Sequence, residues 1–482
     1  MPVTAAYKPY PRFEHLGPEF ADPVAPAAFP QHILRRRNQA WAERIGLGQL
    51  NAAEWEAHFA RFEPLPGNMN QPLAMRYHGH QFRTYNPDIG DGRGFLFAQV
   101  LDADGRLLDL ATKGSGQTPY SRFGDGRLTL KGGVREVLAA EMLDALGVYT
   151  SKAFSLFETG EQLTRGDEPS PTRSSVLVRL SHSHIRFGTF QRLAYFERAD
   201  LMHQLIEHAV ACYYPRRANL NAEARAAALF GEIVEANARL AASWMAAGFV
   251  HGVLNTDNLN ITGESFDYGP WRFLPTSEPG FTAAYFDQTG LYAFGRQPEA
   301  VSWALAQLGG AFTLVCPQSE LEAGLARYGP AYQMHLRDAT FRRLDLAEGD
   351  FEADLDFLAK MFAWLTESQA GWDQFFHDWH GGGASLSRAL ESPQAARYTE
   401  PTFAPIRDGL EARASSNAAA RLAYDYFQRP APVSLAIEEV EALWAPIAER
   451  DDWSPFEAKL NAIGELREAL GASCHGSVAK AD

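Results

Sequence analysis

The chain has few cysteines and a deficit of positive charge. Its 482 residues include three cysteines, Cys212, Cys316 and Cys474, and none of them forms a C-x-x-C pair. This number is too small for a disulfide framework, so we expect two core thiols and one thiol in the tail. Lysine and arginine number 44 against 59 aspartates and glutamates, a formal net charge of -15. Because a phosphate backbone needs a basic surface, this balance argues against non-specific nucleic-acid binding.

Long apolar runs are also missing. No stretch is apolar for long enough to cross a bilayer, and Met1-Pro2-Val3-Thr4 begins neither a basic nor an apolar signal segment. We therefore expect a cytoplasmic protein without membrane attachment. We also expect a monomer. The composition, 46% hydrophobic and 21% charged, is that of a globular protein. The length allows two or three cores or one large two-lobed unit.

The strongest local signals lie between residues 85 and 116. Gly90-Asp91-Gly92-Arg93-Gly94 precedes the apolar run 95–101, and turn residues at 102–105 precede a second run, 107–112. This pattern predicts a glycine loop followed by a β-hairpin whose second strand ends at Lys113. A dinucleotide fingerprint would need a strand before the glycines, and residues 114–116 lack the G-K-[ST] of a P-loop.

An amphipathic helix is predicted next, because apolar residues recur every four positions at Val134, Leu138, Met142 and Leu146. Gly147 is expected to cap its end. Glu136 lies off this apolar stripe, so we expect it to point away from the packing centre and to be free to meet a charge. Residues 174–180 are predicted to form a strand that carries Arg179, with Arg186 following it.

Helices are predicted in two other parts of the chain. Near the N-terminus there are two helical patches, at 40–45 and 53–62. After residue 200 the predicted helices are 201–212, 222–247, 299–308, 319–328, 351–366 and 437–449. A mixed first half followed by a helical second half is typical of the two-lobed plan of protein kinases, with a boundary expected near 190–200.

One loop carries the clearest chemical signal. His251-Gly252-Val253-Leu254-Asn255-Thr256-Asp257-Asn258 resembles the kinase catalytic loop H-R-D-L-x-x-x-N, and Asp267-Tyr268-Gly269 resembles the D-F-G triplet. Val253 occupies the place of the kinase catalytic aspartate and cannot accept a proton. Asn258 and Asp267 are oxygen ligands that suit Mg²⁺ or Mn²⁺ on nucleotide phosphates. An Asx-rich turn is the alternative for this stretch.

Three further features have both a functional and a purely structural interpretation. Lys113 at a strand end and Glu136 on a helix match the kinase Lys–Glu pair; a surface lysine and a solvated glutamate are the alternative. Asp257 is the carboxylate that could replace the missing base, or it could only structure the turn. Arg179 and Arg186 suit phosphate oxygens, with surface ion pairs as the alternative.

Four histidines form two H-x-H pairs, at His78, His80, His182 and His184. No carboxylate or cysteine cluster completes a zinc site around either pair. We therefore expect them to be core or loop histidines.

Several runs of this sequence are similar to the selenoprotein O (YdiU) family. They are Gly79-His80-Gln81-Phe82, Asn86-Pro87, Gly90-Asp91-Gly92-Arg93, the run from Lys113 to Arg122, Asp125-Gly126-Arg127, Arg135-Glu136, the run from His251 to Asn258, Asp267-Tyr268-Gly269-Pro270, and the run from Tyr292 to Pro298. The resemblance covers residues 75–310 densely. Departures from the family pattern include Lys131-Gly132-Gly133 ahead of the helix and Cys474, which has eight residues after it.

This resemblance implies an α+β, bilobal protein-kinase-like fold. The expected parts are an N-terminal wrapping segment (1–75), a kinase-like N-lobe (76–195), a C-lobe with the catalytic loop (196–310) and a helical C-terminal extension (311–482). It also implies a protein adenylyltransferase that binds ATP in a flipped orientation. Such an enzyme transfers AMP to Ser, Thr or Tyr hydroxyls of proteins, with transfer of UMP from UTP as a second activity.

The resemblance implies roles for individual residues as well. Asp257 would be the proton acceptor, Glu136 would pair with Lys113, and Asn258 and Asp267 would hold Mg²⁺ or Mn²⁺. The nucleotide would be contacted by Gly90, Gly92, Arg93, Lys113, Asp125, Gly126, Arg179, Arg186 and Asp267. Two other functions remain open: a pseudokinase scaffold that binds nucleotide without turnover, and a small-molecule phosphotransferase, against which Val253 argues.

Overall fold

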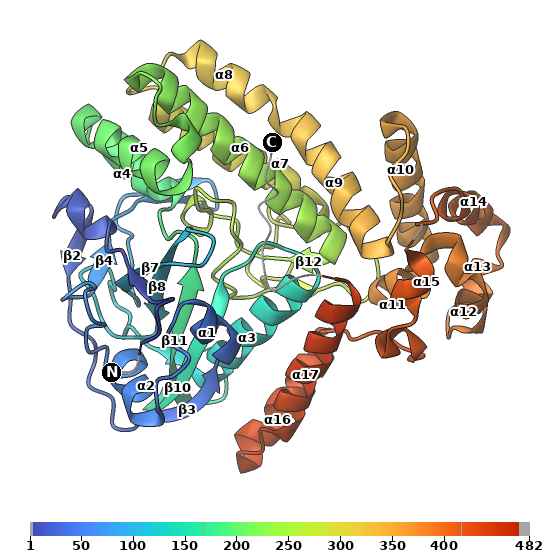
Figure 1. Ribbon diagram of the computed structural model, residues 1–482, viewed down its shortest axis with the longest axis horizontal. Helices are drawn as coiled ribbons and strands as arrows, with labels where there is room; N and C mark the ends of the chain where they lie inside the picture. The colour runs from blue at the N-terminus through green and yellow to red at the C-terminus, as the bar shows by residue number, and fades with distance from the viewer. Residues whose placement is uncertain (1–2, 167, 416, 472–482) are drawn as a thin grey trace.

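An antiparallel sheet of nine strands dominates the N-terminal half of the computed structural model, which describes residues 3–166, 168–415 and 417–471 (Figure 1). The strand order is β2-β4-β7-β8-β11-β10-β3, with β1 paired to β7 and β9 paired to β11. The strands are β1 (Lys8–Pro9), β2 (Ala21–Pro23), β3 (Ile33–Arg37), β4 (Leu73–Met75), β7 (Leu96–Leu101), β8 (Leu107–Lys113), β9 (Leu128–Thr129), β10 (Lys152–Leu163) and β11 (Thr172–Ser181).

Two short hairpins lie outside the large sheet. They are formed by β5 (Gly79–Gln81) with β6 (Thr84–Asn86) and by β12 (Phe249–Val250) with β13 (Arg272–Phe273). The predicted hairpin at 95–113 is confirmed as β7 and β8, which pair directly. The predicted strand at 174–180 is confirmed within β11, whereas β10 was not predicted.

The first 37 residues supply three strands to the sheet. β1 pairs with β7, β2 with β4, and β3 with β10. Two helices follow, α1 (Gln39–Arg44) and α2 (Ala52–Phe59), and each has an asparagine cap, Asn38 and Asn51, that accepts a hydrogen bond from the first turn. Both lie where helical patches were predicted.

The sheet has an apolar layer on each face. Side chains on a strand alternate between faces, so Val176, Val178 and Leu180 of β11 pack with α1 and α2, whereas Leu177 packs with the core that contains α3 (Leu130–Ala145). Arg179 is two positions after Leu177 on β11, so its side chain lies on the same face of the sheet as Leu177, the face that α3 covers. Lys113 is the register partner of Leu177, so it belongs to the α3 face as well. The sheet therefore directs these two cations toward the same side.

A group of helices packs beside this sheet, at the top of Figure 1. Its members are α4 (Phe187–Tyr195), α5 (Ala199–Tyr213), α6 (Ala222–Ala247), α7 (Gln297–Phe312), α8 (Gln318–Ala326) and α9 (Tyr328–Leu344). The predicted helix 222–247 is confirmed with the same bounds, and Gly248 ends it in the left-handed conformation, φ 67°. The predicted helix 319–328 overruns α8, because a new helix with Pro330 in its first turn begins at Tyr328.

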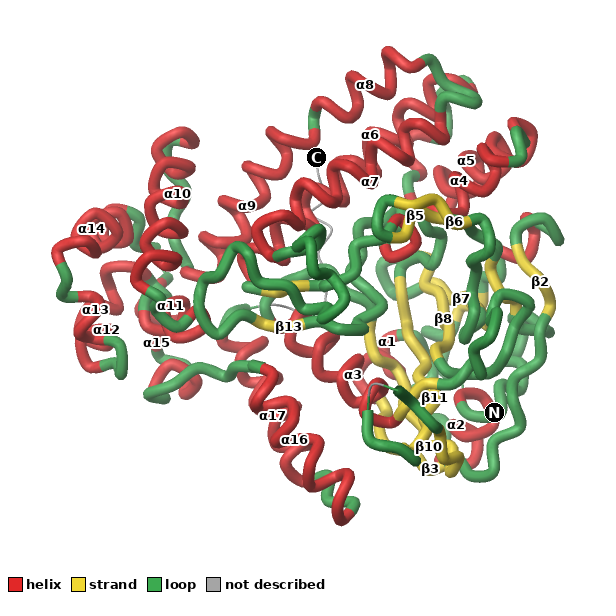
Figure 2. The backbone as a smooth tube through the Cα atoms, turned by 180° about the vertical axis from the view of Figure 1, so that it is seen from behind, coloured by secondary structure: helices red, strands yellow, loops and turns green. Residues whose placement is uncertain are grey.

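Most of the remaining helices form a separate apolar cluster, whereas the last two pack in the same core as α3. The remaining helices are α10 (Phe351–Ser368), α11 (Trp372–Asp378), α12 (Leu386–Glu391), α13 (Ala395–Tyr398), α14 (Ala404–Ala412), α15 (Ala418–Leu422), α16 (Ile437–Arg450) and α17 (Ser454–Ala469). The last two lie beside α3 in both backbone views (Figures 1 and 2), and Arg467 of α17 pairs with Glu141 of α3 at 2.7 Å. The sequence did not predict α17.

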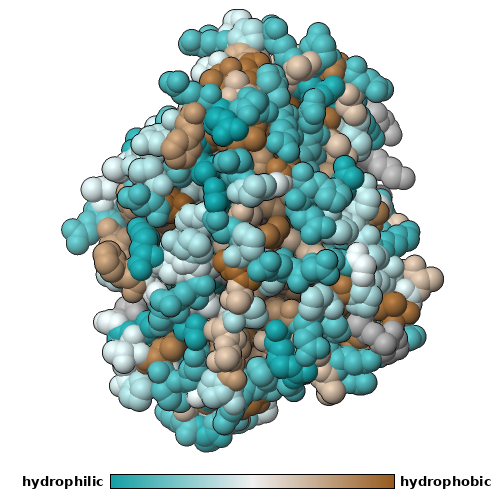
Figure 3. All heavy atoms as spheres, turned by 90° about the vertical axis from the view of Figure 1, so that its left-hand side faces the viewer, coloured by the Kyte–Doolittle hydropathy of each residue, from teal (hydrophilic) through white to brown (hydrophobic). Residues whose placement is uncertain are grey.

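Seven single-turn 3₁₀ helices complete the described secondary structure. They are η1 (Phe13–Leu16), η2 (Pro215–Arg217), η3 (Thr256–Asn258), η4 (Phe294–Arg296), η5 (Gly382–Ser385), η6 (Pro401–Phe403) and η7 (Asp425–Gln428). Among the described residues, no helix combines the length and apolar character that spanning a bilayer would require. On the face shown in Figure 3, hydrophilic side chains predominate and hydrophobic ones form small separate groups.

Candidate active site

A cavity of about 720 Å³ opens between the sheet and the loops around it. Its walls come from the glycine loop before β7, the ends of β8 and β11, the loop 120–127, and the segment that follows α6. Ten predicted site residues line it: Gly90, Gly92, Arg93, Lys113, Asp125, Gly126, Arg179, Arg186, Asp257 and Asp267. The structure therefore brings together residues that are up to 177 positions apart in the sequence.

Lys113 and Glu136 form a buried ion pair at one wall of the cavity. Lys113 ends β8, and its Nζ contacts Oε1 of Glu136, which lies in the second turn of α3. Glu136 is only 2% exposed, so the expectation that it points away from the packing centre is wrong. It is buried because α3 packs its whole inner face on the sheet. The alternative of a surface lysine and a solvated glutamate is also wrong.

Asp267 is the second carboxylate on Lys113. Its Oδ1 lies 2.5 Å from Lys113 Nζ and 3.4 Å from Arg179 Nη1. The residue is in the left-handed conformation, φ 64°, which is uncommon for a residue other than glycine. Desolvation would raise the pKa of Asp267, but the surrounding cations, Lys113 first, hold it well below its ordinary value. The carboxylate therefore stays ionised at neutral pH.

Arg179 and Arg186 are buried arginines rather than members of surface ion pairs, with exposures of 4% and 6%. Arg186 Nη2 lies 3.2 Å from Oδ1 of Asp91, and its Nη1 donates to the carbonyl oxygen of Asp257 at 2.8 Å. Its guanidinium also lies 4.5 Å from the centre of the Tyr77 ring. Ion pairs, a carbonyl and a ring face thus compensate the burial of this charge.

The loop 251–258 is held in place by side chains from distant elements. His251 donates its N–H to Oε1 of Gln297 at 2.9 Å. Thr256 Oγ1 accepts the N–H of His80 at 2.8 Å and donates to Gln191 at 2.7 Å. Asn255 Oδ1 accepts the N–H of Phe82 at 3.0 Å and the Tyr292 hydroxyl at 2.9 Å. The β5–β6 hairpin and the 292–298 segment, both part of the family resemblance, therefore position this loop.

Asp257 is buried beside the cavity. Its Oδ1 has no hydrogen-bond partner among the described residues, which is unusual for a buried polar atom. Burial raises the pKa of Asp257 to about 6, against the opposing charge of Arg186. A carboxylate with this pKa is mostly ionised at pH 7 and can accept a proton.

Asn258 and Asp267 are suitable metal ligands. Asn258 donates Nδ2 to the carbonyl of Val253 at 3.0 Å, so its Oδ1 is directed elsewhere, and both residues are half-buried. Within the described ranges no cluster of three or more His, Cys, Asp and Glu residues suits a metal ion. Mg²⁺ and Mn²⁺ need fewer protein ligands, because nucleotide phosphates and water complete the shell. The two donor types, an amide oxygen and a carboxylate, suit such an ion, although Asp267 lines the cavity and Asn258 is not among its lining residues.

The glycines at the mouth of the cavity are required by close packing. A Cβ on Gly90 would lie 2.5 Å from the ring of Tyr120, and one on Gly126, whose φ is 71°, would lie 2.2 Å from the backbone of Gly116. The glycine loop and the loop 120–127 therefore pack directly on each other. Tyr120 is fixed by a hydrogen bond from its hydroxyl to Asp22 of β2.

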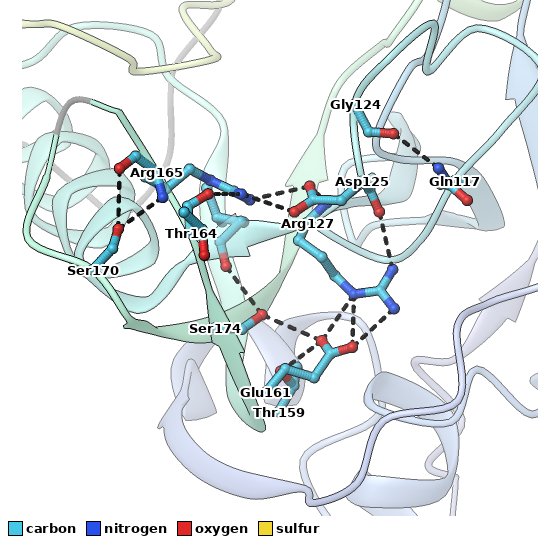
Figure 4. A network of polar contacts seen from close by, with 11 residues as sticks. Gln117, Gly124, Asp125, Arg127, Thr159, Glu161, Thr164, Arg165, Ser170 and Ser174 are labelled. Carbon is cyan, nitrogen blue, oxygen red and sulfur yellow. Dashed lines mark hydrogen bonds and ion pairs between the residues drawn. The ribbon is translucent and has the colours of Figure 1, made fainter.

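Asp125 belongs to a polar network that joins this loop to the β10–β11 hairpin (Figure 4). Its carboxylate accepts two hydrogen bonds from Arg165, at 2.8 and 3.0 Å, and the N–H of Arg127 at 2.9 Å. Arg127 in turn forms an ion pair with Glu161 at 2.8 Å. Asp125 lines the cavity as expected, but in this structure its charge is already paired.

Several residues of the site carried no recognised sequence signal. Asp91 lies inside the glycine run and was not singled out, although it pairs with Arg186. Gln81, visible in the sequence only as part of a motif, lines the cavity, and its side chain acts against the raised pKa of Asp257. Phe123 and Arg165 lie in turns without any periodic pattern. The signal available for Asp91 and Gln81 was their position next to predicted site residues.

The histidines and cysteines lie apart from this chemistry. His182 and His184 are buried, and His184 contacts Asp109 at 3.3 Å. His78 contacts the Tyr85 hydroxyl at 2.9 Å. Cys316 is buried and Cys212 is half-buried. Cys474 lies outside the described residues.

Comparison with known proteins shows the family. Residues 3–464 match the family model described as "Protein adenylyltransferase SelO". The chain belongs to the SelO family. Proteins named "Protein nucleotidyltransferase YdiU" are similar to it over most of their length. The one from Synechococcus elongatus is 45% identical over 480 residues, 95% of each chain, and the one from Gloeobacter violaceus is 45% identical over 95% of this chain and 94% of its own. The one from Vibrio cholerae is 36% identical over 81% of this chain and 80% of its own.

Membership of the SelO family establishes the class of this protein. It is an enzyme, a nucleotidyltransferase of the protein adenylyltransferase family. The cavity residues described above all lie inside the matched range.

Proposed function

We propose that this enzyme transfers AMP from ATP to Ser, Thr or Tyr hydroxyls of proteins, releasing pyrophosphate. One observation carries the proposal: Lys113 and Arg179 pair with Asp267 in a cavity that Arg186 and Asp257 also line, while Val253 replaces the kinase base. Cations and a metal-binding carboxylate suit a triphosphate. The family description, a protein adenylyltransferase, supports the same reaction.

The proposal includes a kinase-like arrangement of two lobes with ATP bound in the flipped orientation. The ion pair of β8 with α3 and the loop 251–269 support the kinase-like plan. The buried arginines support the flip, because guanidiniums suit the terminal phosphates better than an adenine edge. The α-phosphate would then face Asp257.

The reaction would proceed by direct displacement at the α-phosphate. The acceptor oxygen forms a bond to the α-phosphorus as the bond from that phosphorus to the oxygen bridging to the β-phosphate breaks. Asp257 accepts the hydroxyl proton. Lys113, Arg179 and Arg186 stabilise the charge that develops on the departing pyrophosphate. A Mg²⁺ or Mn²⁺ ion held by Asn258 and Asp267 would neutralise phosphate charge.

Two further parts of the proposal concern scope. Transfer of UMP from UTP is proposed as a second activity, since the cations recognise the triphosphate that both nucleotides share. We also propose that the enzyme acts as a monomer in the cytoplasm; the small number of cysteines is consistent with a reducing compartment. Gel filtration and cell fractionation test this second part.

Labelled ATP tests the reaction. The enzyme is incubated with a protein mixture, Mg²⁺ or Mn²⁺, and ATP labelled on either the α- or the γ-phosphate. Label from the α-position on protein is the expected result, and repeating the assay with α-labelled UTP tests UMP transfer. Label from the γ-position, on protein or on a small molecule, would indicate a phosphotransferase. Nucleotide binding without transfer would indicate a pseudokinase scaffold.

A further inference from the structure

Phe123 has an unusual position for an apolar side chain. It is fully exposed, with a relative accessibility of 107%, yet it lines the cavity. Single exposed apolar residues are common on protein surfaces and need no explanation. The location of Phe123 at the mouth of a site for a nucleotide is what requires one.

The loop that carries Phe123 is fixed at its base and open at its tip. Ser121 Oγ donates to the carbonyl of Gly92 at 2.5 Å, and the N–H of Gly124 donates to the carbonyl of Ser121 at 2.7 Å, which closes a turn. Arg122 is left-handed, φ 53°. Residues 122–125 are exposed. The turn therefore holds the phenyl ring out at the edge of the cavity.

The other side of this turn is fixed as well. The two hydrogen bonds from Arg165 hold Asp125, two residues after Phe123, against the turn that follows β10 (Figure 4). Arg127 is bound by Glu161. Two cations at this end of the cavity, Arg127 and Arg165, are thus each engaged by a carboxylate on the neighbouring element.

The opposite end of the cavity is buried and suits phosphates. Lys113, Arg179 and Arg186 are each less than 10% exposed there, and the first two pair with Asp267. A triphosphate at this end leaves the nucleobase at the exposed end. Its aromatic face then meets the loop 122–125.

We propose that Phe123 stacks on the nucleobase and is the residue through which the site binds the base of its nucleotide. This rests on the proposed function, which puts a nucleoside triphosphate in the cavity. A phenyl ring carries no hydrogen-bonding group to discriminate between bases, so it accepts both adenine and uracil. Stacking is sequence-tolerant because every base has a π-face. The larger purine gains more contact.

The test measures binding rather than turnover. The dissociation constants of ATP, UTP and inorganic tripolyphosphate are measured by calorimetry for the full chain and for Phe123→Ala. We expect ATP to bind about tenfold more weakly to the variant, from the usual contribution of one base–aromatic stack. The affinity for UTP should fall less than the affinity for ATP. Tripolyphosphate, which has no base, should bind equally to both proteins.

Two further variants make the result specific. Phe123→Trp retains an aromatic face and should restore ATP affinity. Tyr424→Ala removes another exposed aromatic side chain that does not line the cavity, and it should leave all three constants unchanged. Because Phe123 is fully exposed, its removal should not change the melting temperature.

The outcomes separate this inference from the proposed function. Equal ATP affinity in the wild type and Phe123→Ala would overturn the stacking role, as would an equal loss for tripolyphosphate. If the wild type binds ATP with the expected dependence on Phe123 but transfers no α-label to protein, the proposed reaction fails and the stacking role stands. A wild type that binds no ATP overturns both.

Discussion

The ammonium nitrogen of Lys113 lies 2.5 Å from Oδ1 of Asp267. The same nitrogen is paired with Glu136, so a single buried cation is shared by two carboxylates from different segments. Glu136 holds the lysine in position from behind. Asp267 faces the cavity, where phosphate oxygens and a metal ion would compete for both groups.

Lys113→Ala should abolish transfer. The substitution removes a phosphate contact and leaves Glu136 as an unpaired buried charge, a loss that costs about 3–5 kcal/mol of stability. Label transfer from α-labelled ATP should fall by about 10²–10³-fold, measured on the folded fraction. The matched control is Lys152→Ala, which removes a buried lysine paired with Asp144 away from the cavity. Comparable loss in both variants would indicate a stability effect alone.

Asp257→Asn should impair the chemical step and spare binding. The amide has nearly the same shape but cannot accept the hydroxyl proton, so kcat should fall by about 10²–10⁴-fold. The dissociation constant for ATP, measured by calorimetry, should stay within a factor of about two of the wild-type value. Such a change is small against a tenfold change in affinity, which corresponds to about 1.4 kcal/mol. A variant with undiminished kcat would show that Asp257 only structures the turn.

Removal of divalent metal should stop transfer reversibly. Dialysis against a chelator is expected to abolish α-label incorporation, and added Mg²⁺ or Mn²⁺ should restore it.

Asp267→Ala should abolish transfer at any metal concentration. The milder Asp267→Asn removes charge from the ligand, so calorimetric titration of metal in the presence of a non-hydrolysable ATP analogue should show weaker binding. Unchanged metal affinity in this variant would place the metal elsewhere.

Val253→Asp should not create a kinase. The new carboxylate occupies the position of the kinase base, but the flipped nucleotide keeps its γ-phosphate away from the acceptor. No γ-label should reach protein, and α-label transfer should persist. Appearance of γ-label would mean that ATP lies in the ordinary kinase orientation.

Glu264→Gln should change how stability depends on pH. Burial raises the pKa of Glu264 to about 7 from an ordinary value near 4.5, although the N–H of His182 opposes the shift. Because the folded state favours protonated Glu264, proton binding stabilises the folded protein. This stabilisation is complete below about pH 4.5 and is lost as the pH rises through 7. The glutamine variant lacks this loss.

The measurement is the free energy of unfolding between pH 5 and 8 in urea. Above pH 7 the free energy of unfolding of the variant should exceed that of the wild type by roughly 3 kcal/mol more than it does at low pH. This is the difference that the raised pKa of Glu264 implies. Parallel curves for the two proteins would show that Glu264 is ionised in the folded state throughout.

Local patterns were enough to predict a large part of this protein from its sequence. The apolar runs on either side of the turn residues 102–105 predicted the β7–β8 hairpin, and the long apolar period with Gly248 after it predicted α6. Both signals depend on residues close in sequence. The loop 251–258 and Asp267 were identifiable for a similar reason, since their spacing is itself the motif.

Tertiary structure decided the contacts between distant segments. The burial of Glu136, the pairing of Asp91 with Arg186, and the hold of Arg165 on Asp125 join residues 23 to 95 positions apart. No local period encodes such pairs, because strand register and helix packing determine which side chains meet. The sequence therefore specified which residues could serve a nucleotide, and the packing of α3 on the sheet determined how their charges are arranged.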